Sequence, residues 1–176
     1  MEIVGGGPAK GGTMVAIDAL GIYLNDHLGG AAAGVELAER LRANNEGTPF
    51  GGVLTQMVLE IKEDRATLEN LMDRLGIERS AGKQTAGRGL ERIARLRTNK
   101  ALTRNAELSR LLDIEALQLG VEGKFAMWRA LGEIADLDQR LGATDFDGLA
   151  ERAHRQRDTL EQYRRQSTVL VFSSKS

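Results

Sequence analysis

Apolar residues recur at intervals of three and four along most of the chain, which is the spacing of one face of an α-helix. The first such stretch begins near Met14, with Thr13 as its predicted N-cap, and ends near Asn44 to Gly47. Its predicted inner face consists of Ile17, Leu20, Leu24, Leu28, Ala31, Val35, Ala38 and Leu41. This stripe predicts a first long helix.

Three further long helices follow from the same spacing. The second begins after Thr48-Pro49 and ends at the C-cap Gly76, the third spans residues 106–135, and the fourth runs from Asp145 or Asp147 to near Arg165. Their predicted inner positions include Leu54, Met57 or Val58, Ile61, Leu68, Leu71 and Leu75 in the second helix, and Leu149, Ala153, Gln156, Leu160 and Tyr163 in the fourth. Short loops between long helices predict antiparallel neighbours.

The segments outside these helices divide the chain further. Residues 1–12 are rich in glycine and predict a flexible lead before a bundle domain at 13–166. Between the second and third long helices, a short helix is expected at 86–98, with Leu90, Ile93 and Leu96 on its apolar face. The tail, residues 167–176, contains a β-branched apolar run that we expect to dock on the bundle or to pair with another copy. The predicted fold is therefore an all-α, up-down four-helix bundle with an extra short helix in this crossover.

Composition agrees with this fold and narrows the function. The chain has 176 residues, 4% aromatic residues and two prolines, which suits one helical domain. A net charge of −1 gives no general attraction to nucleic acid or membranes. The absence of cysteine excludes disulfides, thiolate metal sites and a cysteine nucleophile. Because neither a signal peptide nor a long apolar span is evident, we expect a cytoplasmic protein.

Sequence motifs in three of the helices resemble those of a known group. Leu24-Asn25-Asp26-His27-Leu28 resembles the opening of the first ferritin helix, and Glu63-Asp64-Arg65-Ala66 lies where ferritin-like proteins often carry Glu-x-x-His-Ala. With Leu119-Gly120-Val121-Glu122-Gly123-Lys124 in the third helix, the chain resembles small bacterial ferritin-like four-helix-bundle proteins over most of residues 20–135. This resemblance implies a fold and brings no activity with it.

The expected ferritin-like metal ligands are incomplete. A di-iron site of this fold takes a Glu from each of two helices and Glu-x-x-His from the other two. Ala31 to Ala33 occupy the place of the first Glu, and Arg65 occupies the place of a histidine. Only Glu151 and His154 of the fourth helix keep Glu-x-x-His, and an exposed pair on a solvated helix face is the commoner explanation of this spacing. The sequence therefore predicts a degenerate di-metal site.

Two carboxylates in the third helix leave two alternatives open. Glu115 and Glu122 lie one heptad apart on a stripe with Leu111, Gln118 and Phe125, where a buried charge needs a partner. In one alternative, Fe or Mn is bound by His27, Glu36, Glu60, Asp64, Glu115 and Glu122. In the other, Arg65 and Lys124 pair with the carboxylates in a core ion-pair network. We favour the network, because a fixed cation repels a metal and satisfies the carboxylates.

Other features offer little catalytic chemistry. The two histidines have no serine in a strand-turn-helix elbow, and the glycine-rich segments lack a phosphate-loop pattern. The crossover is strongly basic, with Glu91 as its single acidic residue against Arg79, Lys83, Arg88, Arg92, Arg95, Arg97, Lys100 and Arg104. Such a patch could bind phosphate, nucleic acid or an acidic partner. Pairing of its arginines with the acidic faces of residues 60–73, or with a second subunit, is the favoured interpretation.

These observations together predict a non-enzymatic structural or interaction protein. The alternatives are a noncanonical Fe- or Mn-binding protein or oxidoreductase of the same fold, and an anion- or nucleic-acid-binding module. The run of small residues at 29–34 reduces helix propensity and suggests close approach by another helix or chain. Together with the apolar tail, it predicts a homodimer.

Overall fold

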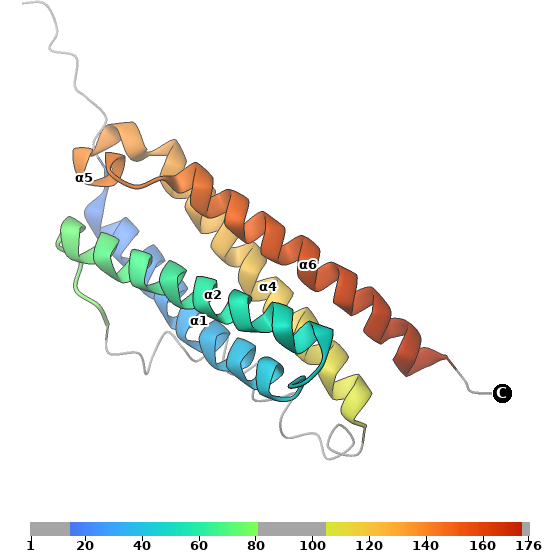
Figure 1. Ribbon diagram of the computed structural model, residues 1–176. Helices are drawn as coiled ribbons and strands as arrows, with labels where there is room; N and C mark the ends of the chain where they lie inside the picture. Colours follow the sequence, from blue (N-terminus) through green and yellow to red (C-terminus); the bar gives the residue numbers. More distant parts are fainter. Residues whose placement is uncertain (1–14, 81–104, 174–176) are drawn as a thin grey trace, which may run out of the picture.

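The computed structural model describes residues 15–80 and 105–173, and in these ranges it contains helices and no strand (Figure 1). Four long helices form the body: α1 (Ile17–Ala43), α2 (Pro49–Leu75), α4 (Ala106–Glu133) and α6 (Phe146–Phe172). A 3-10 turn (Ala135–Leu137) and the short helix α5 (Gln139–Gly142) join α4 to α6. The all-α prediction is confirmed, whereas the short helix expected at 86–98 lies outside the described residues.

The helices form two antiparallel pairs, α1 with α2 and α4 with α6 (Figure 1). Arg40 near the end of α1 pairs with Asp113 near the start of α4 at 2.7 Å. At the other end, Arg140 of α5 donates to the carbonyl of Leu75, the last residue of α2, at 3.0 Å. Helices α2 and α4 therefore run in the same direction, so the predicted up-down alternation holds within each pair and not between α2 and α4. The predicted antiparallel arrangement of helices joined by short loops is confirmed.

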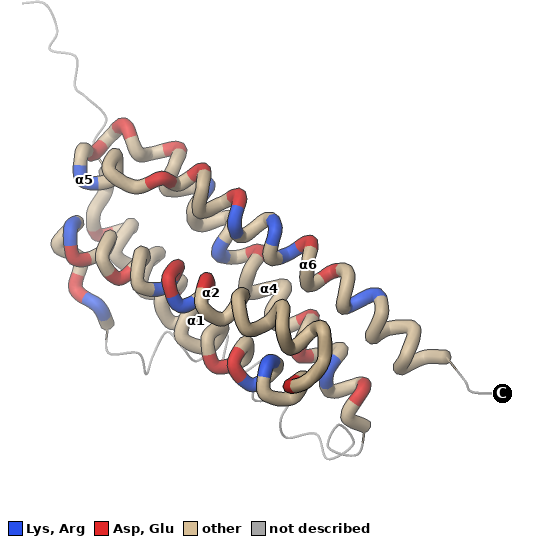
Figure 2. Tube along the Cα trace, in the orientation of Figure 1, with Lys and Arg blue, Asp and Glu red and all other residues tan. Residues whose placement is uncertain are grey.

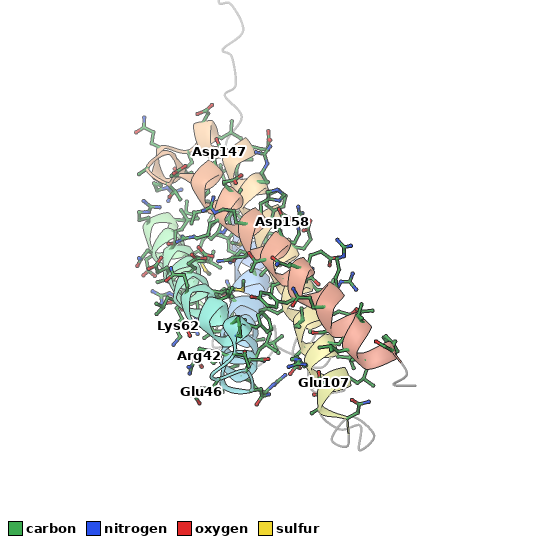
Figure 3. All side chains as sticks on the ribbon, turned by 45° about the vertical axis from the view of Figure 1, so that its right-hand side comes forward. Arg42, Glu46, Lys62, Glu107, Asp147 and Asp158 are labelled. Carbon is green, nitrogen blue, oxygen red and sulfur yellow. The ribbon has the colours of Figure 1, made fainter. Side chains whose placement is uncertain are left out.

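Side-chain positions agree with this topology (Figure 3). Arg42 and Glu46, where α1 turns into α2, lie at the same end of the molecule as Glu107 at the start of α4, and Asp147 at the start of α6 lies at the opposite end. The segment at 81–104 therefore links two ends of the bundle. Because a 27-residue helix is about 40 Å long, the end of α2 and the start of α4 are separated by a comparable distance.

Local chemistry fixes most helix ends where the sequence predicts them. Thr48 caps α2 by accepting a hydrogen bond from Gly51 N at 3.1 Å, and Gly76 ends it with φ of 70°. Asp145, rather than Asp147, caps α6 by accepting from Gly148 N at 2.9 Å. Helix α1 begins at Ile17, and the predicted cap Thr13 lies outside the described residues.

The end of α6 differs from the prediction. The helix continues to Phe172, seven residues past Arg165, so the apolar run at 168–172 is helical and not an extended tail. The Thr168 hydroxyl donates to the Arg164 carbonyl at 2.9 Å within the helix. Valine and threonine are only weakly disfavoured in helices, and no glycine or proline interrupts α6 here, so the helix propagates to Phe172.

The core consists of two apolar clusters along the bundle. One gathers around Trp128 and Leu141, and the other around Leu54 and Ile114. On α1, Leu28, Ala31 and Val35 are only partly buried, while the row Gly29, Ala33 and Leu37 is buried in their place. Helix α1 packs against both α2 and α4, and the row Gly29, Ala33 and Leu37 lies on its inner side. Among the described helices, none has a stretch long and apolar enough to cross a membrane.

Candidate functional site

A buried carboxylate, Asp64 of α2, lies at the centre of the bundle and is only 1% exposed. Lys124 Nζ of α4 donates to its Oδ2 at 2.5 Å. Arg152 Nη2 of α6 lies 2.7 Å from its Oδ1, as an ion pair without hydrogen-bond alignment. Burial of a lone carboxylate is costly, and these two cations, from two other helices, compensate that cost.

Gln156 of α6 extends the same cluster. Its Oε1 accepts from Lys124 Nζ at 2.6 Å, and its Nε2 donates to Glu60 Oε2 at 2.8 Å. Arg152 Nη1 also donates to Glu63 at 2.9 Å. We refer to Glu60, Glu63, Asp64, Lys124, Arg152 and Gln156 as the central polar network. The network links α2 to α6, which also contact each other where the rings of Phe50 and Tyr163 stack with centroids 4.0 Å apart.

The network holds a lysine that is largely buried. The Lys124 side chain is 15% exposed, and burial lowers the pKa of its ammonium, while the Asp64 carboxylate acts in the opposite direction. Losing Asp64 would leave this cation buried without its strongest partner. The arrangement therefore depends on the Asp64–Lys124 pair being intact.

Glu115 and Glu122, the two carboxylates of α4 that were predicted to be in the core, lie outside the central polar network. Glu115 is 43% exposed and lies 3.9 Å from Arg164, and Glu122 is 51% exposed and pairs with Arg157 at 3.0 Å. The prediction that they are buried and pair with Arg65 or Lys124 is wrong. They lie at the edge of the α4 stripe, where arginines of α6 and water satisfy them. Arg65 instead pairs with Glu69 on its own helix at 2.9 Å.

The six predicted metal ligands do not converge. Glu60 and Asp64 belong to the central polar network, Glu36 is exposed on α1, and Glu115 and Glu122 face α6. His27 is half-buried on α1, where its ring packs edge-on against Tyr23 with centroids 4.5 Å apart, and burial lowers its pKa. Within residues 15–80 and 105–173, no group of three or more His, Asp or Glu side chains could hold a metal ion.

Three network residues, Glu63, Arg152 and Gln156, were not assigned to a site from the sequence. Gln156 was expected to point inward, and it does, but its role as a bridge depends on the contact between α2 and α6. Arg152 gives no signal, because it adjoins the Ala153 stripe at an ordinary surface position. Asp64 does carry a signal, since it lies three residues after Ile61 and four before Leu68, on the apolar stripe of α2.

Arg79 is the one basic residue of the crossover that the structure describes. Arg79 pairs with Asp73, with Nε at 3.1 Å from Oδ1, and this contact lowers the pKa of the Asp73 carboxyl. That pairing agrees with the favoured interpretation, in which crossover arginines meet the acidic face of α2. The remaining basic residues, from Lys83 to Arg104, lie outside the described residues.

Comparison with known proteins gives no relative from which a role could be inferred. No protein-family model, curated protein or solved structure matches this chain. What supports a function is therefore the chemistry of the central polar network and of the surfaces around it.

Proposed function

We propose that this chain is a non-enzymatic, ferritin-like helical bundle in which the central polar network takes the place of a di-metal centre. Its role is then structural or interaction-based. The observation that carries the proposal is the position of Lys124 Nζ and Arg152 Nη2, 2.5 and 2.7 Å from the two oxygens of Asp64.

The chemistry of these groups supports the proposal. Lysine and arginine side chains offer donors and no lone pair for a metal while they are charged. A carboxylate that already holds two cations is electrostatically compensated, so a divalent cation at the same place would be repelled. Of the carboxylates in the network, Asp64 alone is fully buried, and both of its oxygens are in contact with cations.

The helix arrangement supports the ferritin-like part. Ferritin-like bundles have one long crossover between two antiparallel helix pairs. Here α2 and α4 run in the same direction and are joined through residues 81–104. The position at which the resemblance implies a histidine carries Arg65, which pairs with Glu69 on the outer part of α2.

Metal content tests the proposal most directly. The full-length protein is purified without chelator, and its Fe and Mn are measured by elemental analysis. We expect far less than one metal ion per chain. Stoichiometric Fe or Mn would overturn the proposal in favour of a noncanonical metal-binding protein or oxidoreductase.

Stability in metal-free buffer tests the network itself. Asp64→Asn should lower the free energy of unfolding by about 3–5 kcal/mol, because it leaves Lys124 buried without its carboxylate. Glu122→Gln removes an exposed ion pair with Arg157 and should cost no more than about 1 kcal/mol. Urea denaturation measures both variants. Equally small losses of unfolding free energy in both variants would contradict the network. So would a stabilisation of the parent protein that appears only when metal is added and that Asp64→Asn abolishes.

A further inference from the structure

A cleft of about 190 Å³ lies between α1 and α4, with α2 as its floor. Its rims are formed by Gly30 and Gly34 of α1 and by Gly120 and Gly123 of α4. Ile61, Leu68, Leu117, Val121 and Met127 contribute apolar surface. We refer to this space as the glycine cleft, and it is distinct from the contacts between α2 and α6 that complete the central polar network.

The four rim glycines keep the cleft open. A Cβ built on Gly30, Gly34, Gly120 or Gly123 meets no described atom within 4 Å. Alanine would therefore fit at each position and would favour the helix by about 0.5–1 kcal/mol. No close helix contact requires these glycines. The absence of side chains at these positions leaves the cleft unfilled. The expectation that Gly30 and Gly34 allow a neighbouring helix of the bundle to approach closely is therefore wrong.

Hydrogen-bond donors in the cleft have capacity to spare. The Trp128 side chain is fully buried, lines the cleft, and its indole N–H has no hydrogen-bond partner in the described structure. Arg65 bonds to Glu69 through Nε, which leaves its two terminal nitrogens for another acceptor. Lys124 Nζ donates to Asp64 and Gln156, and an ammonium has a third hydrogen.

Neither of the two acidic residues that line the cleft is a free buried acceptor. Asp64, the buried carboxylate on its wall, is held by Lys124 and Arg152. Asp26, the other acidic lining residue, is exposed to solvent. The cleft therefore joins an apolar body to an excess of donors, two of which are on cationic side chains. That combination suits an anionic acceptor group on an apolar molecule.

We propose that the glycine cleft binds a small apolar molecule carrying one carboxylate, such as an aryl or short alkyl carboxylate. The apolar part of the ligand lies between the glycine rims. Its carboxylate accepts hydrogen bonds from Arg65, with Lys124 and the Trp128 indole N–H as further donors. The site shares Asp64 and Lys124 with the central polar network and so rests on that network holding no metal, which elemental analysis tests separately.

Three probes of the same size distinguish the chemistry. The full-length protein is titrated with benzoate, benzyl alcohol and benzylamine, and binding is followed by backbone amide NMR shifts. Benzoate should bind about tenfold or more tightly than either of the others, because hydrogen bonds to a charged group are the strong ones. Equal affinities for the three probes, or no saturable binding of benzoate, would overturn the proposal.

Paired variants locate the carboxylate. Arg65→Met should weaken benzoate binding about tenfold, because it keeps the side-chain stem and removes the donors. Glu69→Gln removes the same ion pair and keeps the guanidinium, so its affinity should stay at the parent value. If both variants lost binding equally, Arg65 would act through the ion pair alone and the assignment would be wrong.

A second pair locates the apolar part. Gly34→Leu fills the cleft and should abolish benzoate binding while the protein stays folded, because the position is open and helical. Gly52→Leu places the same side chain in open space on α2, away from the cleft, and should bind as the parent does. Unfolding midpoints of both variants confirm folding. Unchanged binding by a folded Gly34→Leu protein would place the ligand elsewhere and overturn the proposal.

Discussion

At the scale of single residues, two consecutive glycines at the start of α2 face different surroundings. A Cβ on Gly51 would lie 2.1 Å from the backbone oxygen of Asn45, whereas a Cβ on Gly52 meets nothing within 4 Å. Asn45 is held in place because its side chain donates to the Leu41 carbonyl at 2.7 Å and its own carbonyl accepts from the Thr48 hydroxyl at 2.7 Å. The turn between α1 and α2 therefore packs directly on Gly51.

This contrast gives a matched prediction. Gly51→Ala should destabilise the protein by about 1–3 kcal/mol, because the turn backbone must move away from the new methyl group. Gly52→Ala should stabilise it by about 0.5–1 kcal/mol, because alanine favours the helix. Urea denaturation of both variants gives the two free energies. A stabilising effect of both substitutions would show that the turn can shift at no cost.

Burial of individual charged residues could be predicted only in part. Asp64 was expected to pair with Arg65 or Lys124, and the structure confirms the pair with Lys124 and shows Asp64 buried on the apolar stripe of α2. Glu115 and Glu122 looked similar on α4, yet they lie at the edge of the stripe. Whether an edge carboxylate meets a cation depends on the register between α4 and α6. Helix periodicity within one segment contains no information on that register.

At the scale of elements, the four helices are joined by two kinds of contact. Helices α4 and α6 share the most extensive interface, with Arg157 and Arg164 of α6 pairing along its edge with carboxylates of α4. Figure 2 shows basic and acidic residues alternating along much of α6. Helices α2 and α6 are joined by the central polar network and by the stacked rings of Phe50 and Tyr163. Neutralising a charged residue should therefore weaken the buried contacts between α2 and α6 more than the edge pairs between α4 and α6.

Glu161 provides a pH test of the α4–α6 interface. Hydrogen bonds from Arg164 and from Gln118 of α4 lower the pKa of its carboxyl to about 2, from 4.5. A lowered pKa means that its stabilising effect is present above pH 4.5 and is lost as the pH falls toward about 2. Carboxyl ¹³C NMR should show Glu161 still ionised at pH values where exposed glutamates are protonated.

Two controls accompany this titration. Gln118→Ala removes one of the two donors and should raise the pKa of Glu161 toward its ordinary value. Glu161→Gln should flatten the decrease in unfolding free energy between pH 4.5 and about 2, relative to the parent protein. A Glu161 carboxyl that titrates like an exposed glutamate would show that the contact with Arg164 is not maintained in solution.

The extent of the elements was predictable where chain-local signals exist. Thr48-Pro49, Gly76 and Asp145 mark helix ends through their own capping chemistry, and the structure places the ends there. The end of α6 was not predictable, because β-branched residues are compatible with both a strand and a helix. The hydrophobic run at 168–172 continues the helix because no stop signal precedes it.

At the scale of the whole molecule, one end of α6 carries an exposed apolar surface. Val169, Leu170 and Phe172 are between 62% and 71% exposed. No charged residue lies among them, and the last turns of α6 are uncharged in Figure 2. The other large apolar residues that are strongly exposed in the described structure, among them Ile22 and Leu59, are spread over different helices. A concentrated apolar surface of this kind is typical of an interaction site.

We predict that this surface joins two copies of the chain. Because it is helical, it offers side chains and not the free strand edge that the sequence suggested, so the contact is expected to be helix against helix about a two-fold axis. Sedimentation velocity of the full-length protein at tens of micromolar should show a dimer. Combined Leu170→Gln and Phe172→Gln substitutions should give a folded monomer, because neither side chain contributes to the core.

The matched control changes two equally exposed apolar residues elsewhere, Ile22→Gln and Leu59→Gln, and should leave the dimer intact. Substitution is a sharper test than truncation at Gln166, because truncation would also remove Ser167, which is buried against the bundle. A strictly monomeric parent protein would refute self-association. A dimer that survives the α6 substitutions and is lost in the control would move the interface to the faces of α1 and α2 that carry Ile22 and Leu59.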